Sequence, residues 1–330
     1  MSNLLITGGK LRENGFELGE GKYYGCAKLL KVNTTNGQIE ELLSVSNGNE
    51  NFPDIHPNLE FTAGDIEGNN LWLSTDTEIR CYSYPGLELL KIYSHPCFHN
   101  IHSVAVHGEK LFVTSTGLDM VVILDKKNGS IISYHNAEGK DTWHRFDSGF
   151  DYRKIHSTRP HDCHPNYVFW INGEPWITRC TQEDAVQLSN LNNRIDISGP
   201  TKTISVHDGI VKGDHVYFTS VDGCIVIADI NTNKVLETFN VTTLKGYGGL
   251  RGWCRGLFIT NNIIYLGFSR LRKTRRIEKI QWVSHLINKG KPIENCSVLA
   301  INILKREIIA DYHISDNMID AIYSILPEPY

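Results

Sequence analysis

The sequence predicts an all-β protein, built as one six-bladed β-propeller from the whole chain, residues 1–330. Three observations predict this fold. A unit of about 40 residues recurs along the chain, and that period is typical of propeller blades. Each copy contains short β-rich runs separated by turn-forming residues. The strand-like runs left over at the two ends add up to one further unit.

The clearest copy of the unit is residues 101–136. Its β-rich runs are separated by His107-Gly108, Gly117-Leu118-Asp119 and Asn128-Gly129, which are turn signals, so it reads as a four-stranded antiparallel meander. Four more copies occupy 61–95, 163–197, 202–241 and 253–314, the last interrupted by a long insertion. The chain therefore contains five complete predicted blades.

The sixth predicted blade combines both ends of the chain. The N-terminal region supplies three runs, LLITGG, AKLLKVNTT and QIEELLSV, and the C-terminal region supplies one, MIDAIYSIL. Pairing the C-terminal strand with the N-terminal blade would close the ring and remove its exposed edges. A β-sandwich, two smaller β domains, or a ring of five or seven blades are the alternatives.

Composition narrows the function classes. The chain is 41% hydrophobic and 21% charged, as in globular proteins, and its net charge of −4 argues against a nucleic-acid partner. No apolar run approaches the ~18 residues of a membrane span, so no membrane partner is expected. Residues 1–9 lack the features of a secretory signal, and the eight cysteines form no CxxC pair. These features predict free thiols and a cytoplasmic protein.

The blade pattern, together with the step Cys163-His164-Pro165-Asn166, carries a family resemblance. The architecture resembles the six-bladed propellers of the strictosidine synthase and gluconolactonase type. It also looks like bacterial propellers with a Cys-His-x-Asn step in an inner strand. The resemblance covers most of the chain in architecture. The acidic metal ligands of gluconolactonase-type enzymes have no evident counterparts, so that mechanism is not carried over.

The repeat alignment predicts which residues line the central channel, because the first strand of each blade faces the axis. When the blades are aligned on the first apolar residue of their second strands, one position on the first strands is equivalent from blade to blade. It is occupied by Thr62, His102, His164, His207, Arg255 and, in the closing strand, Asp320.

Three histidines at one level predict a metal site. His102, His164 and His207 would hold a divalent transition metal such as Zn, Fe or Mn, and three ligands leave positions open for water or substrate. Asp320 would be a fourth ligand or would orient metal-bound water. The alternative is a polar channel without metal, since the chain has 14 histidines and channel linings are commonly polar.

A second tier is predicted above this ring. His99 and His161, each three residues before a ring histidine, would move protons. Arg255, Arg251 and Arg159 would bind an acidic group of a substrate, because a guanidinium pairs with carboxylate or phosphate. Thr62 and Trp253 are placed with the substrate-binding residues.

Two insertions, 137–160 and 269–294, are predicted to lie over this mouth of the channel, where long loops commonly bind ligands. The second contains a predicted amphipathic helix and a basic stretch. The basic side chains would attract an anion or would simply be solvated.

The sequence thus predicts a metal-dependent lyase, isomerase or hydrolase that acts on a small anionic substrate at the channel mouth. The first alternative is a mononuclear non-haem iron oxygenase. The second is a non-catalytic propeller that binds a protein or glycan. The fold itself does not choose among them.

Overall fold

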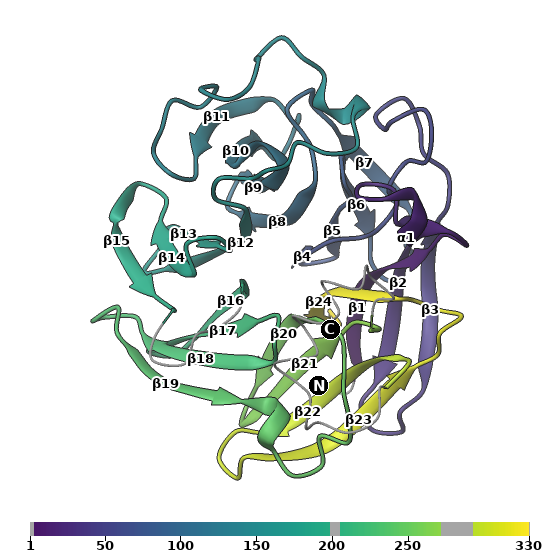
Figure 1. The fold of residues 1–330 in the computed structure, drawn as a ribbon, viewed down its shortest axis with the longest axis vertical. Helices are drawn as coiled ribbons and strands as arrows, with labels where there is room; N and C mark the ends of the chain where they lie inside the picture. Colours follow the sequence, from purple (N-terminus) through teal and green to yellow (C-terminus); the bar gives the residue numbers. More distant parts are fainter. Residues whose placement is uncertain (1–2, 199–204, 272–292, 330) are drawn as a thin grey trace.

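A computed structural model of the chain describes residues 3–198, 205–271 and 293–329. Six four-stranded antiparallel sheets surround a central axis, which confirms the predicted six-bladed propeller (Figure 1). The short helices within these ranges are α1 (Gly15–Leu18), η1 (Thr116–Leu118), η2 (Tyr152–Lys154) and η3 (Val241–Thr243). None of the helices in the described ranges has the length and hydrophobicity that a membrane crossing requires.

Each blade runs from an innermost strand at the axis to an outermost strand at the rim. Blade 1 contains β24 (Ala321–Pro327), β1 (Asn3–Leu11), β2 (Tyr24–Asn33) and β3 (Ile39–Val45). Blade 2 contains β4 (Asp65–Glu67), β5 (Asn70–Ser74), β6 (Ile79–Ser83) and β7 (Leu89–Tyr93). Blade 3 contains β8 (Ile101–His107), β9 (Lys110–Ser115), β10 (Met120–Asp125) and β11 (Ile131–Asn136).

The second half of the ring repeats this order. Blade 4 contains β12 (Pro165–Ile171), β13 (Glu174–Arg179), β14 (Asp184–Gln187) and β15 (Asn190–Asp196). Blade 5 contains β16 (Val206–Lys212), β17 (His215–Ser220), β18 (Cys224–Asp229) and β19 (Val235–Asn240). Blade 6 contains β20 (Cys254–Thr260), β21 (Ile263–Phe268), β22 (Cys296–Asn302) and β23 (Glu307–Ile314).

The ring closes between the two ends of the chain, as the sequence predicted. β24 pairs antiparallel with β1, with Thr7 opposite Ser324 and Gly8 opposite Ile322. The Thr7 and Ser324 hydroxyl oxygens lie 2.9 Å apart in the buried interior of this pair. Figure 1 shows the yellow β24 beside the purple β1, so the first and last segments share one blade.

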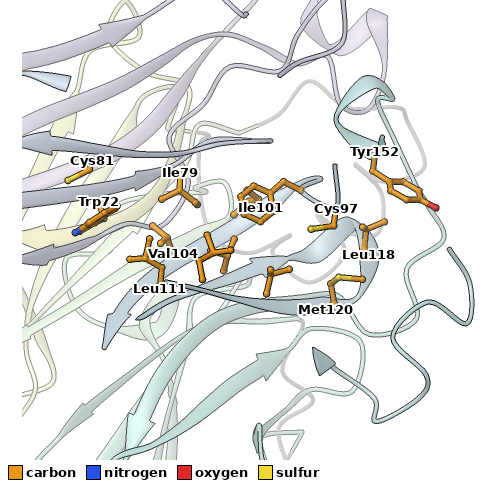
Figure 2. Packing of buried hydrophobic residues seen from close by; sticks show 14 residues of the cluster. Trp72, Ile79, Cys81, Cys97, Ile101, Val104, Leu111, Leu118, Met120 and Tyr152 are labelled. Atoms are coloured by element: carbon orange, nitrogen blue, oxygen red, sulfur yellow. The ribbon is translucent and has the colours of Figure 1, made fainter. Parts of the chain in front are cut away.

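The hydrophobic core lies between neighbouring blades. Figure 2 shows the cluster between blades 2 and 3, where Trp72 and Ile79 of blade 2 pack with Val104 and Leu111 of blade 3. Successive residues of a strand point to opposite faces, so each blade contributes side chains to the layer on either side of it. The eight cysteines are all free, and six of them are buried.

The innermost strands share a local irregularity that positions the channel residues. In five of the described innermost strands the pairing register shifts, so that a β-bulge interrupts the ladder. His102, His207, Arg255 and Tyr323 each occupy such a bulge, in β8, β16, β20 and β24. The side chains at the axis thus come from the bulge residues of the innermost strands, which are not paired in the ladder.

The first insertion, 137–160, leaves blade 3 and crosses to blades 1 and 2. The Tyr152 N–H donates to the Pro96 carbonyl at 2.8 Å, and Lys154 Nζ donates to the Phe52 carbonyl at 3.0 Å. Nε2 of His156 lies 2.7 Å from the Ile55 carbonyl oxygen. Most of the second insertion, residues 272–292, together with its predicted helix and most of its basic stretch, lies outside the described residues.

Candidate functional site

Three histidines from consecutive blades meet in the channel. The ring centroid of His102 lies 4.8 Å from that of His164 and 6.0 Å from that of His207. His102 and His207 are nearly inaccessible to solvent, with 6% and 2% of their surface exposed. The structure therefore brings together the three histidines that the repeat alignment selected.

Hydrogen bonds assign the tautomers of two of these imidazoles. Nδ1 of His207 lies 3.2 Å from the Asp208 carboxylate, and Nδ1 of His102 lies 3.1 Å from the Asn100 carbonyl. Each partner is an acceptor, so the neutral imidazole carries its hydrogen on Nδ1 and presents a lone pair at Nε2. Nε2 of His207 is buried and has no hydrogen-bond partner.

All three histidines are held neutral. Burial lowers the pKa of His102 and His164 well below the ordinary value, and neighbouring imidazoles and Arg255 lower both further. Burial also lowers the pKa of His207, although Asp208 opposes the shift. Neutral imidazole is the form that binds metal ions.

Asp119 positions His164, which precedes β12 and has a left-handed backbone with φ +58°. One carboxylate oxygen of Asp119 accepts the N–H groups of Cys163 and His164 at 2.9 and 2.8 Å. The other accepts the N–H of Asp162 at 2.9 Å and Arg145 Nη1 at 2.8 Å. This buried carboxylate fixes the turn that carries His164. In the sequence Asp119 reads only as a turn residue, because its contact with residues more than 40 positions away leaves no local signal.

The two histidines predicted to move protons lie beside this cluster. Nδ1 of His161 is 2.7 Å from Nδ1 of His164, and burial lowers the pKa of His161 to about 4. His99 is fully buried, and burial lowers its pKa to about 4 as well. A Cβ at Gly117 would lie 2.0 Å from Nδ1 of His99, so only glycine leaves room for this ring.

Arg255 is a buried cation in the same channel. Only 7% of the residue's surface is exposed. Its guanidinium carbon lies 4.6 Å from the centre of the Trp253 ring and 4.9 Å from that of the Tyr323 ring. In the described part of the chain no carboxylate oxygen lies within 4.0 Å of it, and its Nε has no hydrogen-bond partner. A buried guanidinium without a carboxylate is costly, and an anionic ligand would offset that cost.

Four other predicted residues already have partners. Arg251 donates to Asp311 at 2.6 Å inside blade 6, and Arg159, on the surface, pairs with Glu20. The Thr62 hydroxyl lies 2.6 Å from that of Ser74. Asp320 accepts hydrogen bonds from Lys10 Nζ at 2.8 Å, the Leu11 N–H at 2.9 Å and Arg270 Nη1 at 2.7 Å, all outside the histidine cluster.

The pairing register explains where Asp320 lies. In β24 the bulge falls between Ile322 and Ser324, so Tyr323 occupies the position equivalent to His102 and Arg255. The repeat alignment that selected Asp320 is therefore displaced by three residues in the closing strand. Asp320 precedes this strand and ties it to β1 through Lys10 instead.

The structure adds a group of acidic and amide side chains that the repeat alignment did not select. Glu60 and Asp76 are both buried, with 3% and 4% exposure, and Asn58 donates to Glu60 at 3.0 Å. The Tyr323 hydroxyl donates to the other oxygen of Glu60 at 2.8 Å. Glu60 lies two residues before Thr62 in the segment that leads into β4, so an every-second-residue pattern was the available signal.

The side chains of the histidine cluster do not form a complete set of metal ligands in this structure. Among the described residues, no three His, Cys, Asp or Glu side chains are already arranged to hold a metal ion. Two hollows of about 360 and 510 Å³ lie elsewhere, the first between blades 3 and 4 beside Trp170 and the second beside Arg12. The histidine cluster, in which His164 is partly exposed, lies in the channel and is not part of either hollow.

Comparisons with known proteins place the fold in a class without assigning a family. No protein-family model matches the chain, and no curated protein sequence matches it. A protein of unknown function from Bacteroides caccae is similar in structure, with a TM-score of 0.63, 12% identity and 100% of both chains covered. A chain in the crystal structure of a nidogen/laminin complex has a TM-score of 0.57 and 10% identity, covering 98% of this chain and 97% of that one. At these identities the likeness shows the six-bladed propeller fold alone.

Proposed function

We propose that the protein is a metal-dependent enzyme, in which His102, His164 and His207 hold a divalent transition metal such as Zn, Fe or Mn. Arg255 binds the acidic group of a small anionic substrate beside it. The observation that carries this proposal is the meeting of three neutral imidazoles, two buried and one partly buried, next to a buried guanidinium that has no carboxylate partner.

The donor groups fit a metal ion in their chemistry. His207 presents a buried Nε2 without a partner, while Asp208 holds its Nδ1. A carboxylate behind a histidine is the usual support of a metal-binding imidazole, because it fixes the tautomer and the ring orientation. His102 is supported in the same way by a backbone carbonyl. Binding would require the three imidazole rings to draw together, since they are not yet arranged as a ligand set.

The residues around this cluster supply the rest of the chemistry. A bound divalent metal would polarise a substrate oxygen or activate water, which suits lyase, isomerase or hydrolase reactions. His161 and His99 are neutral at neutral pH, so either can accept a proton. Arg255 would orient the substrate through its acidic group. Asp320 and Arg251 already have ion-pair partners, so we assign them no part in the reaction.

Two alternatives stand beside this proposal. A mononuclear iron oxygenase would use the same three histidines, and the identity of the metal separates the two. A non-catalytic propeller would bind a protein or glycan; a similar fold occurs in a nidogen/laminin complex, but at 10% identity. Relationship to the gluconolactonase-type propellers and a cytoplasmic location remain predictions from the sequence.

The metal content of variants tests the proposal. His102→Ala, His164→Ala and His207→Ala should each lower the affinity for Zn²⁺, Fe²⁺ or Mn²⁺ by at least about a hundredfold, because each removes a ligand. Elemental analysis and metal titration of the purified chain provide the measurement. His215→Ala, on β17 away from the cluster, is the matched control and should bind metal normally. Wild-type protein that takes up no stoichiometric metal would overturn the proposal.

A further inference from the structure

We propose that the channel binds a small zwitterion of the linear amino acid class, with its carboxylate on Arg255 and its ammonium at the pair of Glu60 and Asp76. This inference rests on the proposed function for the location of the substrate. It goes further in assigning two opposite charges to the ligand, and it adds three residues, Glu60, Asp76 and Tyr323, to the site.

The carboxylate end is defined by Arg255. Two aromatic rings, Trp253 and Tyr323, face its guanidinium, and its Nε is buried without a hydrogen-bond partner. One guanidinium matches the single charge and the planar two-oxygen edge of a carboxylate.

The ammonium end is defined by Glu60 and Asp76. Asn58 links the two acids, since it donates to Glu60 at 3.0 Å and also hydrogen-bonds the Asp76 carboxyl group. The Tyr24 N–H donates to the Asn58 carbonyl oxygen at 3.0 Å and thereby orients the amide. Both acids are more than nine-tenths buried, so they form a fixed group of oxygen acceptors and not a solvated surface patch.

Tyr323 connects the two ends. The guanidinium of Arg255 lies 4.9 Å from the centre of its ring, and its hydroxyl donates to Glu60 at 2.8 Å. The cation and the acid therefore contact the same side chain at two different places, the ring face and the hydroxyl. A ligand that lies along Tyr323 can reach both with its two charged groups.

The charges at the two ends of the site have the polarity that a zwitterion in this orientation requires. Burial raises the pKa of Asp76 well above its ordinary value, and the charges of Glu60 and Glu20 raise it further, so Asp76 holds its proton and the pair carries the one negative charge of Glu60. The other end is positive, because the buried guanidinium of Arg255 keeps its charge. A simple carboxylate would match one end only, whereas a zwitterion aligned with the field matches both.

A homologous series of ligands tests the proposal on the purified chain. The linear ω-amino acids from glycine to aminohexanoate would be titrated by calorimetry, with metal bound and with metal removed. Each would be compared with the carboxylic acid lacking the amine, the ω-hydroxy acid and the alkylamine of equal length. One member of the amino acid series should bind about tenfold or more tightly than all three of its analogues.

Variants assign the two ends separately. Arg255→Met should weaken both the best amino acid and its plain carboxylic acid by about tenfold or more, whereas Glu60→Gln and Asp76→Asn should weaken the amino acid alone. Arg306→Gln is the matched control, because Arg306 also lies over an aromatic ring but pairs with Glu237 on the surface. Its affinities should equal those of the wild type, and circular dichroism checks that each variant is folded.

The results that overturn this proposal differ from those that overturn the metal site. Plain acids or hydroxy acids that bind as tightly as the amino acids, or a series with no binding at about 10 mM, would refute the zwitterion. If no metal binds but the amino acid preference depends on Arg255 and Glu60, the ligand assignment stands and the metal proposal fails. If metal binds and the preference is absent, the reverse holds.

Discussion

His99 shows at the scale of one residue how the channel maintains uncharged imidazoles. The ring is buried between Gly117 and the 137–160 segment, and burial lowers its pKa to about 4. A histidine that is neutral when folded and protonated when unfolded makes stability depend on pH. The unfolded chain binds more protons between the folded pKa of about 4 and the ordinary value of 6.5. Stability therefore rises with pH through this window and is lost as pH falls through it.

The pH dependence of His99→Gln tests this linkage. Between pH 7 and pH 5, the wild type should lose about 2 kcal/mol more free energy of unfolding than the variant, because the variant lacks this proton acceptor. Urea denaturation of metal-free protein at both pH values provides the measurement, and only the difference between the two losses matters. His56→Gln, at an exposed imidazole in the segment before β4, is the matched control. Equal losses for wild type and His99→Gln would show that His99 is not held neutral.

At the scale of the element, four of the five bulges of the inner strands depend on hydroxyl groups from the second strands, whereas in β20 the Gly256 N–H donates to Asp208. A bulge leaves one N–H outside the ladder, and a buried N–H needs an acceptor. Thr114, Thr178, Thr219 and Thr7 supply it, accepting from Ser103, Tyr167, Asp208 and Ser324 at 2.8–3.2 Å. The same hydroxyl position thus recurs around the ring and fixes the backbone next to the channel residues.

Thr178 offers the sharpest test, because its hydroxyl also donates to the His207 carbonyl at 2.8 Å. Thr178→Val keeps the shape but leaves a buried N–H and a buried carbonyl unpaired. The free energy of unfolding should fall by about 2 kcal/mol in chemical denaturation. Thr178→Ser retains the hydroxyl and should lose clearly less, mainly the packing of one methyl group. A valine variant as stable as the serine variant would mean that the bulge does not need this hydroxyl.

Strand pairing also sets the limit on what the sequence could predict. The blades and their order follow from local turns and alternation. The repeat also predicted the meeting of His102, His164 and His207, although His164 precedes β12 and Asn166 occupies the bulge of that strand. Bulges are not visible in an alignment, which is why Asp320 was selected in place of Tyr323. Arg251 was expected near a substrate. Its actual partner, Asp311, lies on a strand 60 residues away, and the local sequence gives no sign of that contact. Contacts of this kind depend on tertiary structure alone.

At the scale of the whole molecule, the ring is held closed by one strand pair, β24 with β1. The site depends on this closure, because Tyr323 of β24 contacts Arg255 of β20 and Glu60 before β4. Gly8 lies at the register shift of the pair. A Cβ at Gly8 would lie 2.2 Å from the carbonyl oxygen of Ala321, which is backbone and cannot turn aside. The closest approach between β24 and β1 therefore requires glycine at position 8.

Gly8→Ala should weaken the closure of the ring. We expect the free energy of unfolding to fall by about 3 kcal/mol, because the clash forces β24 away from β1. Hydrogen exchange should show the larger effect in residues 321–327, whose amides would lose protection before those of the other blades. Gly86→Ala is the matched control, since its Cβ would meet only the Ser83 hydroxyl, at 3.4 Å. If Gly8→Ala matches this control in stability and in the exchange of β24, the closing pair tolerates the extra methyl group, and closure does not depend on this glycine.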